Sequence, residues 1–306
     1  MKAVITGATG VVGMALIEEL LRRDAEILVL CRELSGRAEN IREDIRVKKI
    51  VCALENIKDI EISDKKYDVF FHLAWDGTTG AARNDNYLQI KNIEYTLDAV
   101  RLASRFGCKC FVGVGSQAEY GRAEGKIDGE TPVFAENGYG IAKYAAGRMS
   151  RILCGELGIR QVWARILSVY GPFDNGGSMV MHAITELKKG GTPKFTAGEQ
   201  MWDYIYSEDA ARALVALAER GKDGMVYCIG SGHACKLKEY IEKIRDAAAP
   251  GATIDIGALP YAEGQVMYLC ADISDLERDT GFSISVDFEE GIKRTVEWFD
   301  KQTRQR

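Results

Sequence analysis

The chain has 306 residues, and 46% of them are hydrophobic, which is enough for the core of one large α/β unit or of a nucleotide-binding domain with a smaller lobe. Its net charge of −5 argues against a nucleic-acid-binding protein, which would carry a basic face. No apolar stretch reaches the ~18 residues that span a bilayer, and the eight cysteines lack metal-ligand spacing, so no metal site is expected. Because the sequence enters a strand directly after Met1, we expect no signal peptide and predict a cytoplasmic protein with reduced thiols.

Short β-rich runs alternate with helical stretches over the first two thirds of the chain. The predicted strands are 3–6, 27–31, 48–52, 69–74, 110–115 and 161–169, and the predicted helices between them are 11–22, 87–106 and 139–157. This alternation predicts a parallel sheet covered by helices on both faces. Beyond Gly171 the pattern weakens into a helix (178–189), strand-like segments near Phe195 and over 202–206, a helix (209–220), a strand (225–229), and helices near 236–248 and 288–301.

A glycine-rich turn follows the first predicted strand. Gly7, Gly10 and Gly13 are spaced G-x-x-G-x-x-G. In this order, the first glycine allows a sharp turn, the second allows close approach of a pyrophosphate, and the third allows the helix to pack closely on the sheet. The following helix N-terminus offers free N–H groups to an anion. The turn therefore predicts a dinucleotide site, formed by Gly7, Thr9, Gly10, Val11, Val12 and Gly13.

The end of the second strand bears on which dinucleotide binds. An acidic residue there favours NAD, whereas a cation favours the 2′-phosphate of NADP. This chain has Cys31 in the usual acidic position, Arg32 next to it, and Arg37 in the following loop. We predict a preference for NADP(H), with NAD(H) as the other possible cofactor if Arg32 only stacks on adenine.

Tyr139 and Lys143 lie one helical turn apart, after a strand that ends at Ser116. A phenol with a pKa near 10 is a poor acid or base at neutral pH, but a neighbouring ammonium favours the phenolate. In this hypothesis Tyr139 exchanges a proton with the reacting oxygen, Ser116 hydrogen-bonds that oxygen, and Lys143 also holds the nicotinamide ribose. The alternative is a surface tyrosine and lysine without function, but it does not explain why Ser116, Tyr139 and Lys143 occur together.

With these motifs in order along nearly its whole length, the chain resembles the extended short-chain dehydrogenase/reductase family of nucleotide-sugar epimerases, dehydratases and reductases. The segments that carry the resemblance are 6–13, 68–74, 92–97, 116–121, Tyr139/Lys143, 165–172, 202–209 and 271–274. It implies a Rossmann-like, doubly wound parallel sheet with a smaller α+β C-terminal substrate lobe. It also implies further cofactor contacts at Leu54, Leu73, Ala74 and Asn92, and substrate contacts at Trp75, Gln117 and Ser168.

Departures from the family pattern narrow the reaction. Family dehydratases carry Asp-Glu directly after the catalytic hydroxyl, where this chain has Gln117 and Ala118, so a 4,6-dehydratase is not expected. Trp202 stands where relatives carry an arginine for the substrate diphosphate, and Ser168 where they carry an asparagine. The leading hypothesis is therefore a reductase of a 4-keto nucleotide sugar; a 4-epimerase with tightly held NAD and a non-catalytic dinucleotide sensor are the alternatives.

The resemblance also suggests boundaries and assembly. Residues 1–170, joined by about 207–232, are expected to form the dinucleotide-binding domain, and 171–206 with 233–306 the substrate-binding lobe. Trp75 has two interpretations, a substrate contact and a lid on the core. Family members are often dimers, so the helices at 87–106 and 139–157 predict a homodimer.

Overall fold

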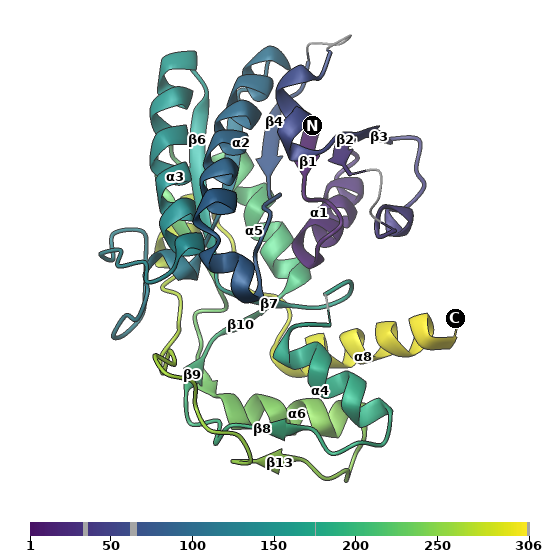
Figure 1. The fold of residues 1–306 in the computed structure, drawn as a ribbon. Coiled ribbons are helices and arrows are strands. Elements are labelled where there is room, and N and C mark those ends of the chain that lie inside the picture. The colour runs from purple at the N-terminus through teal and green to yellow at the C-terminus, as the bar shows by residue number, and fades with distance from the viewer. Residues whose placement is uncertain (33–35, 62–65, 175, 305–306) are drawn as a thin grey trace.

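A seven-stranded parallel sheet forms the centre of the protein in a computed structural model, which describes residues 1–32, 36–61, 66–174 and 176–304 (Figure 1). The strand order is β11-β6-β5-β4-β1-β2-β3, so the order reverses beside β1 as in a doubly wound fold. The strands are β1 (Lys2–Thr6), β2 (Glu26–Cys31), β3 (Val47–Val51), β4 (Val69–His72), β5 (Cys110–Ser116), β6 (Arg160–Ile166) and β11 (Val226–Ile229). The predicted fold class is confirmed.

Helices cover both faces of this sheet because its central strands are apolar on both sides. In β1, Ile5 packs into the core beneath α1 (Val11–Arg22) and α5 (Ser207–Arg220), whereas Val4 packs into the core beneath α2 (Asn86–Arg105) and α3 (Gly138–Leu157). Short 3-10 helices connect these elements: η1 (Ala38–Asn40), η2 (Leu54–Asp59), η3 (Gly80–Asn84) and η4 (Gln117–Glu119).

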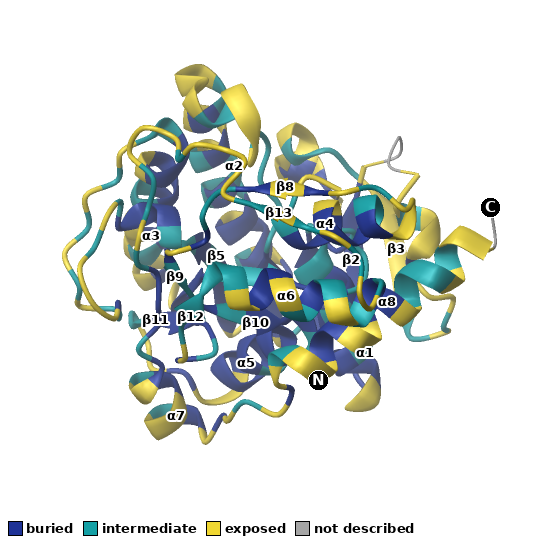
Figure 2. Cartoon of the chain, turned by 90° about the horizontal axis from the view of Figure 1, so that it is seen from below, coloured by how far each residue is buried: buried dark blue, intermediate teal, exposed yellow. Residues whose placement is uncertain are grey.

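A second core lies below the carboxyl ends of the strands, where α4 (Met179–Lys188), α6 (Leu237–Ala248) and α8 (Phe288–Arg304) pack together (Figures 1 and 2). Three two-stranded sheets accompany these helices, in the pairs β7 (Ser168–Tyr170) with β10 (Tyr204–Tyr206), β9 (Met201–Trp202) with β12 (Cys235–Lys236), and β8 (Lys194–Phe195) with β13 (Asp255–Ile256). The run predicted as one strand at 161–169 is divided into β6 and β7, which belong to different sheets. Likewise, the predicted segment 202–206 is divided between β9 and β10.

The sequence did not predict one α-helix of the described residues, α7 (Ser274–Thr280). Helix α7 packs with α5, and its Leu276 joins the main core together with Leu269 and Phe282. The stretch 269–282 thus returns from the second core to the side of the sheet. Its helix is short and polar, which explains the weak periodic signal.

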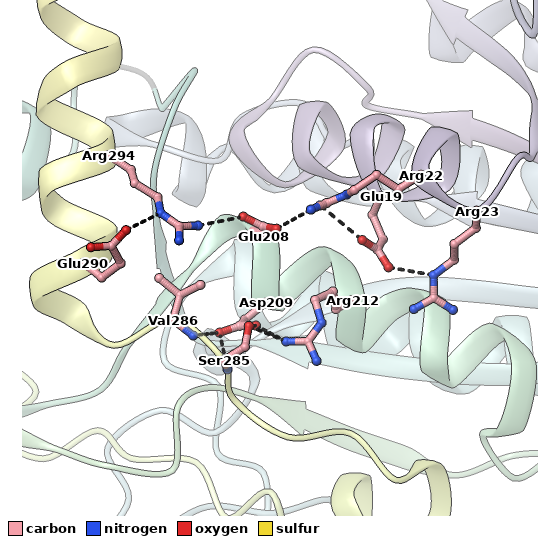
Figure 3. Close-up of polar contacts among 10 residues, drawn as sticks. All are labelled: Glu19, Arg22, Arg23, Glu208, Asp209, Arg212, Ser285, Val286, Glu290 and Arg294. Carbon is pink, nitrogen blue, oxygen red and sulfur yellow. Dashed lines mark hydrogen bonds and ion pairs between the residues drawn. The ribbon is translucent and has the colours of Figure 1, made fainter.

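Charged side chains connect α1, α5 and α8 (Figure 3). Glu208 of α5 accepts from Arg22 of α1 and from Arg294 of α8. Next to it, buried Asp209 accepts from the backbone N–H groups of Ser285 and Val286, at 3.0 and 2.9 Å. These contacts hold the segment before α8 against the helix layer that also carries the glycine turn.

Candidate functional site

The glycine turn after β1 has the geometry that its sequence predicts. Gly7 has φ +74°, and a Cβ there would lie 2.5 Å from the Ala74 nitrogen. A Cβ on Gly13 would lie 2.4 Å from the Gly7 oxygen, so α1 can approach the strand end only with glycine at this position. Gly10 is the N-cap of α1, and no side chain caps it. The N–H groups of the first turn are therefore left to a ligand.

A cleft of about 290 Å³ opens at this turn, along the carboxyl ends of β1, β2 and β4. Seven of the predicted cofactor-binding residues line it: Gly7, Thr9, Gly10, Arg32, Leu54, Leu73 and Ala74. Val11, Val12 and Gly13 lie within α1 just behind the turn. Ligands bind at such a reversal point in open parallel sheets, and the cradle that a Cβ would fill suits a pyrophosphate.

Asn92 takes part in this cleft indirectly. Its side chain accepts from the Asp76 N–H and donates to the Asp76 carbonyl, both at 2.9 Å. The Asp76 carboxylate lies 3.3 Å from the Arg32 guanidinium, which is otherwise largely exposed. Arg32 therefore already has an anionic partner across the cleft. Part of the loop that follows Arg32, residues 33–35, lies outside the described residues.

The three predicted catalytic side chains converge at the end of β5. Ser116 ends that strand, and its side chain accepts from the Ala118 N–H at 3.2 Å. Helix α3 begins close by, and Asn137 caps its first turn. Gly140 lets this turn approach the Ala118 carbonyl, because a Cβ on residue 140 would lie only 2.2 Å from the Ala118 oxygen. The phenol of Tyr139 consequently comes near enough to Ser116 for the serine to lower its pKa.

Lys143 is 3% exposed, and its ammonium donates to the Val114 carbonyl at 2.6 Å. It also lies 3.9 Å from the ring centroid of Trp75 and 5.9 Å from that of Tyr139. Burial lowers the pKa of Lys143 to about 7, and the charge of Glu119 opposes this shift. Around neutral pH this ammonium is therefore close to its titration midpoint.

The pKa of Tyr139 is raised, chiefly by burial. The hydrogen bond from Ser116 and the charge of Arg83 lower it, and the charge of Glu119 raises it. The Arg83 guanidinium carbon stands 4.5 Å from the Tyr139 ring centroid. The cation that counters burial in this structure is thus Arg83, whereas the sequence analysis assigned that effect to Lys143.

Trp75 contacts both members of the pair, since its ring meets the Tyr139 ring edge-on at 6.0 Å. Its indole N–H donates to buried Gln89 at 2.8 Å, which fixes the ring between the cleft and Tyr139. His72, behind Trp75, has its pKa lowered to about 3 by burial and by the charge of Lys143, so it is neutral and takes no part as an acid near pH 7.

The other two predicted substrate contacts are Gln117, which directly follows Ser116, and Ser168, which lies on another strand. Gln117 is on η4, and Ser168 begins β7 and accepts from the Trp202 indole N–H at 2.8 Å. Among the described residues, neither side chain hydrogen-bonds to Ser116, Tyr139 or Lys143. Ser168 is thus paired with the residue that replaces the expected arginine.

Two residues of the site were missed by the sequence analysis in this role. Arg83 belongs to η3, and no local motif indicates that this loop covers Tyr139. Glu119 follows the two positions that hold acids in family dehydratases, and its carboxylate accepts from the Ser116 N–H at 2.9 Å. The motif Ser-x-x-Glu at a helix start could have indicated this capping contact.

Helices α2 and α3 lie side by side (Figure 1). Their exposed apolar side chains are Tyr87, Ile90, Ile141, Met149, Ile152 and Leu157. No helix in the described part of the chain is long and apolar enough to cross a membrane.

Comparison with known proteins agrees with this geometry. The model of the NAD dependent epimerase/dehydratase family matches residues 3–230. A dTDP-glucose 4,6-dehydratase of Streptomyces griseus is 27% identical over 240 residues, covering 76% of this chain and 72% of the relative.

Many solved structures share the fold, and two of them serve as examples. A UDP-N-acetylglucosamine 4-epimerase from Methanobrevibacter ruminantium M1, in complex with UDP-N-acetylmuramic acid, is 23% identical with a TM-score of 0.89, over 98% of each chain. The dTDP-glucose 4,6-dehydratase DesIV from Streptomyces venezuelae, with NAD bound, is 20% identical with a TM-score of 0.87, over 100% of this chain and 98% of that one.

Proposed function

The chain belongs to the NAD-dependent epimerase/dehydratase family of extended short-chain dehydrogenases, and from this premise we propose that it reduces the 4-keto group of a nucleotide-activated sugar. The observation that carries the proposal is the convergence of the buried phenol of Tyr139 and the Ser116 hydroxyl at the end of β5, beside the cleft at the glycine turn. A protonated phenol is the form that a reduction requires, because the carbonyl oxygen must gain a proton.

Dehydration is disfavoured by what surrounds Ser116. The two positions that hold acids in family dehydratases are Gln117 and Ala118 here. The nearby acid Glu119 is fully buried and held by Arg165, so it has no path to a substrate hydroxyl. Elimination of water from a sugar needs acid and base groups besides Tyr139, and positions 117 and 118 supply none.

The residues of the cleft fit a nicotinamide dinucleotide. Gly7, Gly10 and the uncapped start of α1 would hold the pyrophosphate, and Lys143 would hold the ribose next to the nicotinamide. When bound, the dinucleotide supplies or accepts a hydride. Relatives are described with NAD, and nothing in the comparisons supports the predicted NADP(H) preference. The ion pair of Arg32 with Asp76 also leaves Arg32 less available to a 2′-phosphate.

In this mechanism Tyr139 donates its proton to the substrate oxygen and Ser116 donates a hydrogen bond to the same oxygen. Arg83 stabilises the resulting phenolate electrostatically. Trp75 closes the space between Lys143 and Tyr139, and thereby keeps water from the phenol. The lobe formed by residues 171–206 and 233–306 is proposed to hold the nucleotide of the substrate.

A 4-epimerase is the second candidate, because a solved structure with a TM-score of 0.89 is a UDP-N-acetylglucosamine 4-epimerase. The same hydroxyl, phenol and ammonium would serve it, with Tyr139 acting in both directions. An epimerase retains its cofactor between turnovers, whereas a reductase exchanges it.

The test is to denature the purified protein, identify any released dinucleotide by mass spectrometry, and then titrate the protein with NADH and NADPH. We expect exchangeable binding, followed by oxidation of the reduced cofactor when a 4-keto nucleoside-diphosphate sugar is added. Stoichiometric NAD that does not exchange, together with interconversion of 4-epimers, would replace the reductase by the epimerase.

Replacing Arg83 with methionine is expected to move the alkaline limb of the pH profile of reduction to higher pH. Removal of the positive charge over the ring raises the pKa of Tyr139 further, so the phenol stays protonated in a more alkaline range. The measurement is kcat/KM against pH, with Arg101→Met on the exposed side of α2 as the control. If the alkaline limb moved to lower pH or stayed in place, Arg83 would not be the cation that lowers the pKa of Tyr139.

We propose a homodimer through α2 and α3, and Ile152→Arg is expected to convert it to a monomer. Ile152 is 66% exposed on the face of α3 that also carries Ile141, and such a stripe of apolar residues favours a partner surface. Light scattering after size-exclusion chromatography gives the mass. Leu259→Arg, at a site 46% exposed on the second lobe, should remain dimeric. A monomeric unmodified protein would refute the proposal.

A further inference from the structure

Glu119 is a carboxylate with no exposure to solvent, located directly behind the end of β5. One of its oxygens accepts from the Ser116 N–H at 2.9 Å and from the Trp163 indole at 3.1 Å. The other accepts from Arg165 Nε at 2.7 Å. A buried charge costs several kcal/mol unless it is paired and hydrogen-bonded, and Glu119 is both.

These contacts fix the backbone that carries the reactive hydroxyl. Glu119 and Ser116 form a reciprocal cap, in which the Glu119 carboxylate accepts from the Ser116 N–H and the Ser116 hydroxyl accepts from the Ala118 N–H. The first contact anchors the main chain of Ser116, and the second orients its side chain. A change at position 119 therefore acts directly on Ser116.

The carboxylate also acts on α3 through its charge, since it raises the pKa of both Tyr139 and Lys143. Other groups act on the same region. Arg83 of η3 opposes Glu119 at Tyr139, Arg165 of β6 neutralises it locally, and neutral His72 of β4 lies beyond Lys143. On α3, three further polar side chains border a small cavity shared with Glu119: Tyr144, Arg148 and Arg151.

We propose that Glu119 is a positioning residue for this active site, which fixes Ser116 from behind through the contact of its carboxylate with the Ser116 N–H. This role needs the carboxylate at its present reach, whereas a second, electrostatic effect of Glu119, which raises the pKa of Lys143 and of Tyr139, needs only its charge. The proposal deepens the proposed function, because Ser116 must be held in place to hydrogen-bond the reacting oxygen. Only its kinetic test rests on that function.

The charge role is tested without substrate, by NMR titration of protein labelled at the lysine ε-carbons. The Lys143 signal is assigned by its loss in Lys143→Met. In the unmodified protein its midpoint is expected near pH 7, and in Glu119→Gln at a lower pH. Glu119→Asp, which keeps the charge, and Glu124→Gln on an exposed loop should leave the midpoint in place. An unchanged midpoint in Glu119→Gln would overturn this part of the proposal.

The positioning role is tested by a double-mutant cycle in the reduction assay. Glu119→Asp shortens the side chain, and we expect kcat to fall by about ten-fold in the unmodified protein and not at all in a Ser116→Ala background. Equal losses in both backgrounds would show that Glu119 acts elsewhere. If Glu119→Gln does not fold, this cycle still decides the proposal, because Glu119→Asp keeps a carboxylate opposite Arg165. If the unmodified protein shows no turnover, the proposed function is wrong, but the NMR titration still measures the effect of Glu119 on Lys143.

Discussion

Tyr139→Phe is expected to lower kcat by about 10³-fold while dinucleotide binding stays within a factor of a few. The change removes the only atom of Tyr139 that can give a proton to the substrate oxygen, and general acid catalysis contributes about 10²–10⁴-fold. The ring itself remains packed against Trp75 and under Arg83, so the site keeps its shape. Steady-state turnover and fluorescence titration with NADH measure the two effects separately.

Tyr87→Phe is the matched control, since it deletes the same hydroxyl from a tyrosine that is 84% exposed at the start of α2. Its kcat should equal that of the unmodified protein. If Tyr139→Phe retained full turnover, the proton would have to come from another group, and the mechanism above would be wrong. If it lost dinucleotide binding as well, Tyr139 would have a structural role instead.

Gly13→Ala is expected to destabilise the protein by about 3 kcal/mol and to abolish dinucleotide binding. The added methyl group would lie 2.4 Å from the Gly7 oxygen and 2.6 Å from the Ala8 Cα atom, both of them backbone atoms that cannot turn aside. Helix α1 must therefore shift away from the strand end, and overpacking of this kind costs about 1–3 kcal/mol. Chemical denaturation and NADH titration measure the two losses.

Gly10→Ala separates stability from binding at the same turn. The nearest atom to its added Cβ lies at 3.8 Å, an ordinary contact, so the free energy of unfolding should hardly change. The methyl group nevertheless occupies the position that a pyrophosphate approaches, and affinity for the dinucleotide should fall. A Gly10→Ala protein with full affinity would place the pyrophosphate elsewhere.

Local sequence patterns were sufficient for the central sheet and the glycine turn. The β1–β6 strands and helices α1, α2 and α3 lie where the alternation of apolar runs and helical stretches predicts them, because each is long or strongly apolar. Short elements were less well predicted: the division at Leu167 between β6 and β7, and the polar helix α7, depend on packing partners distant in sequence. Two-residue strands such as β9 carry no periodic signal at all.

The sequence alone determined the family and the doubly wound sheet, and it predicted the dinucleotide turn and the set Ser116, Tyr139 and Lys143, because these depend on motifs that follow one another in a fixed order along the chain. Only the tertiary structure decided which charges surround Tyr139. Arg83 and Glu119 reach the phenol and its serine from η3 and η4, and their effect on the pKa of Tyr139 depends on distance and burial. It likewise decided that Arg32 faces Asp76 across the cleft. Electrostatic interactions depend on the distances between charges, and these distances are set only when the chain is folded.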